Sequence, residues 1–281
     1  MISYFAAIGY SGWMINRMFI LALTLVALSV GAAMAQTQEE VVSAEVLPGW
    51  QMENGHRMAG LSLILAPDWK TYWRAPGEAG IPPQFNWSGS ENVKSIRIYW
   101  PSPQVFHTNG LQSIGYHDAV ILPLEVTPID ASRPVMLRAE VDLGVCKDIC
   151  MPAIVTAEAV LEIPGGPDEA IQAALNAQPK SAAEGRVTSL TCAVDPIDDG
   201  LRVTATITMP FSGQTETVAF ESRDPLVWVG QADSMRQGDS LISAVDMVSS
   251  SGEPFALDRS GVTVTVLQQG RGIEVIGCPA P

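Results

Sequence analysis

The sequence predicts an all-β fold in which two β-sandwich domains are joined by a short helical linker. Short apolar segments with a period of two recur on both sides of one segment with helical spacing, residues 164–186. Clusters of glycine, proline, serine and asparagine separate these segments, which is typical of antiparallel strands joined by turns. We therefore expect one sandwich over residues 36–163 and a second over residues 187–281.

Residues 1–35 are expected to be a secretory signal peptide. Arg17 precedes an apolar run from Met18 to about Leu28, and an Ala-x-Ala pattern ends at Ala35. The run is shorter than the roughly 20 residues that a membrane span needs, so we expect cleavage after Ala35 and a soluble, exported product.

The first half contains four clear strand candidates. Residues 135–145 alternate cleanly, with apolar side chains on one face and Arg138, Glu140 and Asp142 on the other. The other candidates are residues 93–100, 119–126 and 153–163, and the intervening turn clusters are residues 75–83, 87–92 and 101–104.

Periodicity also predicts a helix in the linker and strands in the second half. Pro167 and Asp168 suit the start of a helix, whose apolar positions are Ala170, Ile171, Ala174 and Leu175. Strand candidates then return at residues 201–209, 226–229, 241–248 and 262–269.

The charge balance argues against nucleic acid as a partner. The chain has 30 acidic and 16 basic residues, whereas a surface that binds phosphates needs an excess of basic residues. In an exported protein, the four cysteines are first interpreted as two disulfides.

Cys146 and Cys150 can form a disulfide only if the chain turns between them. Along one extended strand their Cα atoms would be about 13 Å apart, which is too far for a disulfide. If residues 135–145 and 151–163 are the arms of a hairpin, Lys147, Asp148 and Ile149 form its loop and the two cysteines face each other.

The two expected disulfides differ in what they contribute to stability. A loop of about five residues is worth roughly 2 kcal/mol of chain entropy, whereas the loop closed by Cys192 and Cys278 is worth roughly 4.6 kcal/mol. We expect the Cys192–Cys278 bond to be structural. For Cys146 and Cys150, geometry alone leaves both a redox role and a plain hairpin link open.

Three separated segments resemble a known family. They are residues 72–93 (YWRAPGEAGIPPQFNWSGSENV), 100–124 (WPSPQVFHTNGLQSIGYHDAVILPL) and 141–153 (VDLGVCKDICMPA). In this order they resemble the N-terminal periplasmic domain of the thiol:disulfide interchange protein DsbD. They are most similar to the variant in the suppressor-of-copper-sensitivity proteins known as ScsB.

The resemblance implies an immunoglobulin-like sandwich over about residues 40–165, and we expect the second sandwich to be immunoglobulin-like too. It also implies a protein-disulfide reductase component that carries electrons from a membrane-embedded thiol reductase to a periplasmic thioredoxin-fold or copper-stress protein, without a cofactor. Cys150 matches the cysteine that forms the mixed disulfide, and Cys146 matches the resolving cysteine. Classical DsbD separates these cysteines by five residues rather than three. The family's eight-helix membrane module and thioredoxin domain do not follow in this sequence, so we expect a stand-alone relay.

The family also shields its cysteines with a cap loop, which by position corresponds to residues 107–116. The resemblance gives Leu111 or Ile114 as the apolar lid, with Phe106 and Tyr116 as flanking aromatic residues. An ordinary turn with core residues at its ends is the alternative.

Two other functions compete with the redox relay. The first is Cu(I) binding, because the sequence contains residue types that bind Cu(I), namely Cys146, Cys150, Met151, His107 and His117. A structural zinc site would need four ligands at a recognised spacing. The second is a non-catalytic adaptor in which both disulfides are structural. We expect no resident metal, and the sequence does not identify the donor, the acceptor or the direction of electron flow.

Overall fold

A computed structural model describes residues 38–78, 80–108 and 110–281 of the chain. The expected signal peptide lies outside the described residues. Gln38–Pro281 forms one compact unit. Within the part of the chain that is described, no helix has the length and apolar character needed to cross a membrane.

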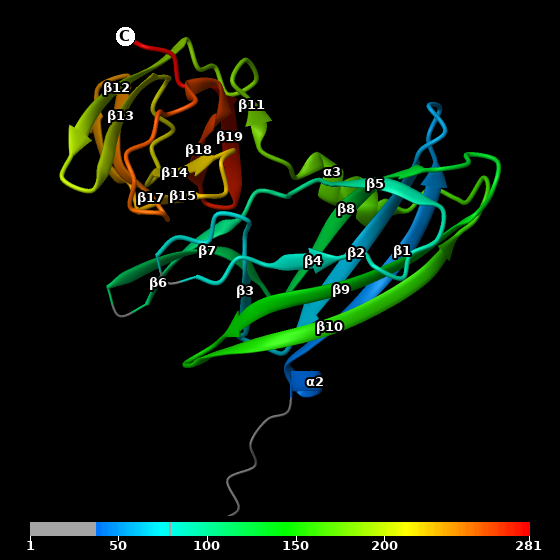
Figure 1. Cartoon of the computed structure of the whole chain (residues 1–281). Coiled ribbons are helices and arrows are strands. Elements are labelled where there is room, and N and C mark those ends of the chain that lie inside the picture. The colour runs from blue at the N-terminus through cyan, green and yellow to red at the C-terminus, as the bar shows by residue number, and fades with distance from the viewer. Residues whose placement is uncertain (1–37, 79, 109) are drawn as a thin grey trace, which may run out of the picture. The chain divides into compact units, whose positions relative to one another are not determined.

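The first half of this unit contains two sheets (Figure 1). A short helix, α2 (Gln38–Val41), precedes them. The first sheet has the order β1-β2-β8-β5, formed by β1 (Val42–Gln51), β2 (Arg57–Leu65), β8 (Ala119–Pro128) and β5 (Val93–Ile98). The second has the order β10-β9-β3-β7-β6, formed by β10 (Cys150–Leu161), β9 (Val135–Cys146), β3 (Lys70–Tyr72), β7 (Leu111–His117) and β6 (Gln104–Thr108). The short strand β4 (Gln84–Asn86) pairs with β9.

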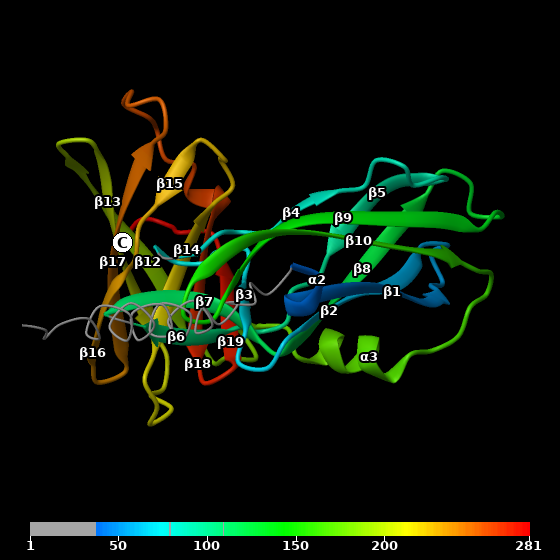
Figure 2. The ribbon, with the colours of Figure 1, turned by 90° about the horizontal axis from the view of Figure 1, so that it is seen from below.

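Strand alternation explains the core between these sheets. In β9 the predicted apolar face is buried from Val135 to Val145, whereas Arg138 and Asp142 on the other face are exposed. β10 pairs with β9 along its whole length, and Figure 2 shows the two strands as one long ribbon. This face packs on Leu61, Leu122 and other buried residues of the opposite sheet.

The predicted helix is confirmed as α3 (Glu169–Asn176). Asp168 is its N-cap, since its carboxylate accepts hydrogen bonds from the backbone N–H groups of Ala170 and Ile171. Ile171 is fully buried. After the helix, β11 (Lys180–Ser181) pairs in parallel with β19 (Arg271–Ile276), the last strand of the chain.

The second half contains two further sheets. One has the order β11-β19-β18-β14, completed by β18 (Val262–Gln268) and β14 (Thr217–Ser222). The other has the order β12-β13-β17-β15, formed by β12 (Ser189–Ile197), β13 (Gly200–Thr208), β17 (Ser240–Ser249) and β15 (Val227–Val229), with β16 (Asp233–Gln237) also paired to β17. A single turn of 3-10 helix, Arg259–Gly261, precedes β18. These sheets enclose a second apolar cluster around Val203, Val245 and Val264.

The all-β prediction is therefore confirmed, with strands forming four sheets and an immunoglobulin-like architecture. The strand candidates at residues 93–100, 119–126 and 135–145 correspond to β5, β8 and β9. Most of residues 107–116, the expected cap loop, forms β7, which pairs with β6. The division into domains at residues 163 and 187 stays a prediction.

Candidate functional site

Cys146 and Cys150 lie at the tip of the hairpin that β9 and β10 form. They are directly opposite each other in the register of the two strands, and Lys147, Asp148 and Ile149 make the loop between them. The two sulfurs are bonded, and the Cα atoms are 4.1 Å apart. The three-residue spacing is therefore sufficient for a disulfide because the chain reverses within it.

The two sulfur-bearing residues differ in exposure. Cys150 is exposed, whereas only 1% of Cys146 is exposed. Both point to the outer face of the second sheet, because they are paired residues on neighbouring strands and the opposite face of β9 is in the core. A thiolate must reach the sulfur that it attacks, so Cys150 is the more accessible residue of the pair.

Tyr72 contacts both sulfurs. It is the last residue of β3, a strand of three residues that pairs with β9 on one side and β7 on the other. Its hydroxyl oxygen lies 2.7 Å from Sγ of Cys146 and 3.3 Å from Sγ of Cys150. Since a disulfide sulfur carries no proton, the phenol is the donor. Burial raises the pKa of Tyr72 above its ordinary value, so the phenol keeps this proton at neutral pH.

Sequence reasoning did not single out Tyr72. β3 is too short to show a period of two, and only the fold brings residue 72 next to residue 146. The available signal was indirect, since Tyr72 opens the first of the three segments that carry the family resemblance.

Lys70 is the other residue of β3 on this face. It is opposite Cys146 on β9 and opposite His117 on β7, so these side chains form one row across the sheet. Its ammonium group lies over the ring of Phe106 at 5.0 Å from the centroid, and 3.4 Å from the hydroxyl of Ser113. Burial lowers the pKa of Lys70. Lys70 therefore links the strand beside the disulfide to the β6–β7 hairpin.

The four expected cap residues divide between the two faces of the sheet. Leu111 and Phe106 lie on the outer face with the disulfide, and Leu111 is 53% exposed. Ile114 and Tyr116 lie on the opposite face within the core, at 3% and 6% exposure, and the Tyr116 hydroxyl donates to the carbonyl of Pro101. Ile114 and Tyr116 therefore lie on the face opposite the disulfide.

The residues considered as Cu(I) ligands are also divided between the two faces of the sheet. Met151 follows Cys150 in β10 and points to the other face, and His107 lies on the face of β6 opposite Phe106. His117 shares the face of the disulfide, and its imidazole Nδ1 lies 3.0 Å from a carboxylate oxygen of Asp118. Among the described residues, no group of three or more His, Cys, Asp and Glu side chains is arranged to hold a metal ion.

The second disulfide joins β12 to the C-terminal segment. Cys192 and Cys278 are bonded with Cα atoms 5.4 Å apart, and both are fully buried. One guanidinium nitrogen of Arg259 donates to the carbonyl oxygens of both cysteines. This environment gives a partner no access to either sulfur.

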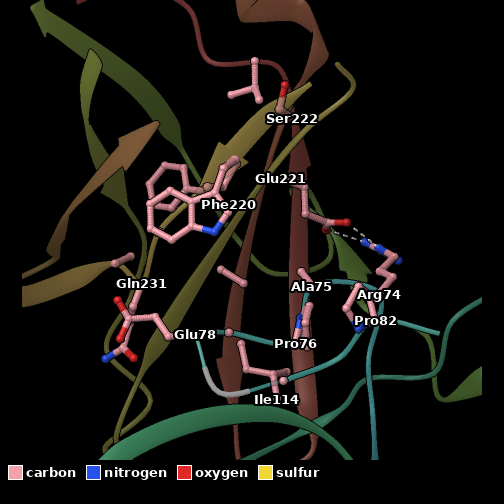
Figure 3. A pocket seen from close by; sticks show the side chains of 18 of the residues that line it. Arg74, Ala75, Pro76, Glu78, Pro82, Ile114, Phe220, Glu221, Ser222 and Gln231 are labelled. Atoms are coloured by element: carbon pink, nitrogen blue, oxygen red, sulfur yellow. Dashed lines mark hydrogen bonds and ion pairs between the residues drawn. The ribbon is translucent and has the colours of Figure 1, made fainter. Parts of the chain in front are cut away.

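Arg74 follows the site in sequence and contacts the second half of the chain. Its guanidinium donates two hydrogen bonds to Glu221, at 2.8 and 2.9 Å (Figure 3). It donates a third to Glu274. Burial opposes the charge, but the hydrogen bonds and charges of Glu221 and Glu274 outweigh it and raise the pKa of Arg74. Beside this ion pair is a cavity of about 700 Å³, bounded by Pro76, Pro82 and Phe220 among others.

The family described as "Thiol:disulfide interchange protein DsbD, N-terminal" matches residues 38–162. Among solved structures, the N-terminal periplasmic domain of ScsB from Proteus mirabilis is similar, with 23% sequence identity and a TM-score of 0.61. The similarity covers 85% of this chain and 92% of that one. No curated protein matches the sequence.

Proposed function

Because residues 38–162 are a DsbD N-terminal domain, ScsB-like, we propose that this protein is a periplasmic thiol-disulfide interchange protein. Its Cys146–Cys150 pair takes two electrons from a membrane-embedded thiol reductase. It passes them to a thioredoxin-fold or copper-stress protein. The observation that carries the proposal is the combination of one exposed sulfur, one buried sulfur and a hydroxyl that donates to both.

The first half of the reaction reduces the disulfide. A donor thiolate attacks the exposed Sγ of Cys150, so a mixed disulfide forms and Cys146 leaves as a thiolate. The Tyr72 hydroxyl donates a hydrogen bond to the sulfur that becomes negative, which stabilises the leaving group. The donor's second thiol then attacks the donor sulfur of the mixed disulfide. Cys150 leaves as a thiolate and the donor's own disulfide forms, so two electrons have entered the pair.

The second half of the reaction runs with the roles exchanged. The Cys150 thiolate attacks a disulfide of the acceptor, which releases one acceptor thiolate. Cys146 then attacks Cys150 in the mixed disulfide, which restores the Cys146–Cys150 bond and releases the acceptor as a dithiol. Cys146 is suited to this resolving step because it lies directly opposite Cys150 in the hairpin and is buried, which shields it from other partners.

Exposed apolar side chains around the disulfide support docking of a protein partner. They are Ile81, Leu111, Ile149 and Ile154, with exposed fractions of 45%, 53%, 73% and 56%. Such residues are common at the centre of protein interfaces. In this proposal Leu111 and Phe106 form the cap, with Ile114 and Tyr116 as its supports in the core. The second half of the chain, residues 187–281, holds the first in position.

Trapping of the mixed disulfide tests the proposal. A Cys146→Ser variant keeps the accessible thiol but cannot resolve, so we expect it to form a stable adduct with an oxidised thioredoxin-fold protein. The matched Cys150→Ser variant keeps only the buried thiol and should form little adduct. Non-reducing electrophoresis with mass spectrometry measures both. A wild-type disulfide that stays closed with excess thioredoxin dithiol would favour the adaptor function instead.

A further inference from the structure

The ring of Tyr72 is held between two glycines. A Cβ atom built on Gly80 would lie 2.9 Å from Cδ1 of Tyr72, and one built on Gly144 would lie 3.0 Å from Cε2. Cδ1 and Cε2 are opposite corners of the ring, so the two glycines leave space for it on both edges. A side chain at either position would press on the ring and on one neighbour, which is Pro76 at Gly80 and Ile81 at Gly144.

Ile81 borders the same space at Gly144. Its Cβ and Cδ1 atoms lie 2.9 and 3.2 Å from the Cβ position of Gly144, and Cε2 of Tyr72 lies 3.0 Å from that position. Two prolines, Pro82 and Pro83, follow it directly. Proline fixes its own φ and restricts the residue before it, so Ile81 is presented on a stiff segment.

We infer that Ile81 is a positioning residue that keeps the Tyr72 hydroxyl against Sγ of Cys146 in the proposed thiol exchange. It acts through Tyr72 and does not touch the sulfurs. The inference goes beyond the proposed function and rests on that function for its relevance.

In the reduced protein, the Tyr72 hydroxyl should favour the thiolate of Cys146 over the thiol, because it donates a hydrogen bond to the thiolate. The other titratable groups near Cys146 are Lys70 and His117 in its row of the sheet, Cys150 across the hairpin, and Lys147 and Asp148 in the loop. Lys147 pairs with Asp68 at 3.0 Å. Substitution of Ile81 leaves all of these groups in place, so it isolates the contribution of Tyr72.

A double-mutant cycle tests the inference without any partner protein. The variants are Ile81→Ala, Ile81→Leu, Tyr72→Phe and the Ile81→Ala, Tyr72→Phe double variant. The reduced proteins are alkylated with iodoacetamide from pH 5 to 10, and mass spectrometry scores Cys146 and Cys150 separately. We expect Ile81→Ala to move the midpoint for Cys146 up by about one pH unit, which corresponds to a weakened charged hydrogen bond. Ile81→Leu should restore the wild-type midpoint.

The double variant separates positioning from general destabilisation. If Ile81 acts through Tyr72, the double variant has the same midpoint as Tyr72→Phe alone. An unchanged midpoint in Ile81→Ala, or a further shift in the double variant, overturns the inference. If Ile81→Ala does not fold, Gly144→Ala places a Cβ atom 3.0 Å from Cε2 of the Tyr72 ring and 2.9 Å from Cβ of Ile81, and it must raise the midpoint in the same way. The experiment measures alkylation of the thiol and uses no partner protein. Its result therefore does not depend on whether a partner exchanges with Cys150.

Discussion

The hydroxyl of Tyr72 lies 2.7 Å from Sγ of Cys146, the less accessible of the two bonded sulfurs. The only proton between these atoms belongs to the phenol, so its hydrogen bond strengthens as negative charge develops on sulfur. Tyr72 therefore contacts a reacting atom and qualifies as a catalytic residue of the proposed exchange.

Replacement of Tyr72 by phenylalanine should slow reduction of the disulfide by a thioredoxin dithiol by about tenfold to a hundredfold. This range follows from the roughly 1.5–3 kcal/mol that a hydrogen bond to a charged group contributes. Stopped-flow fluorescence gives the rate constant. Tyr99→Phe is the matched control, because that hydroxyl donates to Glu125 on the other sheet. Equal slowing in both variants would contradict a specific role for Tyr72.

The contribution of Tyr72 should not vary across physiological pH. Burial raises its pKa above the ordinary value of 10.0, so the donor proton is bound at every lower pH and is lost only as pH rises through the raised pKa. We expect the ratio of the wild-type and Tyr72→Phe rates to be constant from about pH 6 to 9 and to fall at higher pH. A ratio that changes between these limits would point to another group.

The two disulfides should differ in how much they contribute to the free energy of unfolding. Replacement of both Cys192 and Cys278 by alanine should lower the free energy of unfolding by about 4 kcal/mol and leave thiol exchange unchanged. Replacement of both Cys146 and Cys150 should cost about 2 kcal/mol at most and abolish exchange. Urea denaturation measures the first quantity. A loss of exchange in the Cys192 and Cys278 variant would assign that bond more than a structural role.

The Arg74–Glu221 pair should stabilise the protein more than a surface pair of the same kind. Glu221→Gln should lower the free energy of unfolding by about 1–3 kcal/mol, since it leaves part of a shielded guanidinium unpaired. The chain offers a control with the same two-bond geometry in Arg202 and Asp246, which are more exposed. Asp246→Asn should cost less than about 1 kcal/mol. Equal losses would mean that burial of Arg74 does not matter.

The cap proposal predicts faster alkylation when the hairpin is shortened. Deletion of residues 109–113 removes Leu111 and the pairing of Phe106 with Ser113. We expect iodoacetamide to modify the reduced Cys150 several-fold faster, because less of the outer face covers it. The rate in urea provides the unshielded reference. An unchanged rate in the folded variant would remove the cap role from this hairpin.

Sequence periodicity predicted the strands that carry the disulfide but not the residue that contacts it. Residues 135–145 alternate over a length at which a period of two is unambiguous, and β9 follows this pattern. β3 has three residues, too few for any period, and its position depends on pairing with β9 and β7. Tyr72 could therefore be found only from the tertiary arrangement.

The expected cap shows a different limit of prediction from sequence, which is the assignment of residues to the faces of a strand. Leu111 and Ile114 are three residues apart, so within a strand they must point to opposite faces. Interpretation of residues 107–116 as a loop hid this consequence, and both residues were considered for one role. Once β7 is recognised, the alternation places Leu111 and Ile114 on opposite faces, and burial shows that Ile114 lies on the core face.

The register of β9 and β10 extends unbroken from the cysteines to Val135 and Leu161, so the hairpin is held by its ladder whether or not the sulfurs are joined. The oxidised and reduced forms should then have nearly the same backbone conformation, so little rearrangement accompanies each turnover. We expect amide chemical shifts of the two redox forms to differ near residues 144–152 and at Tyr72, and to coincide along the remainder of the ribbon.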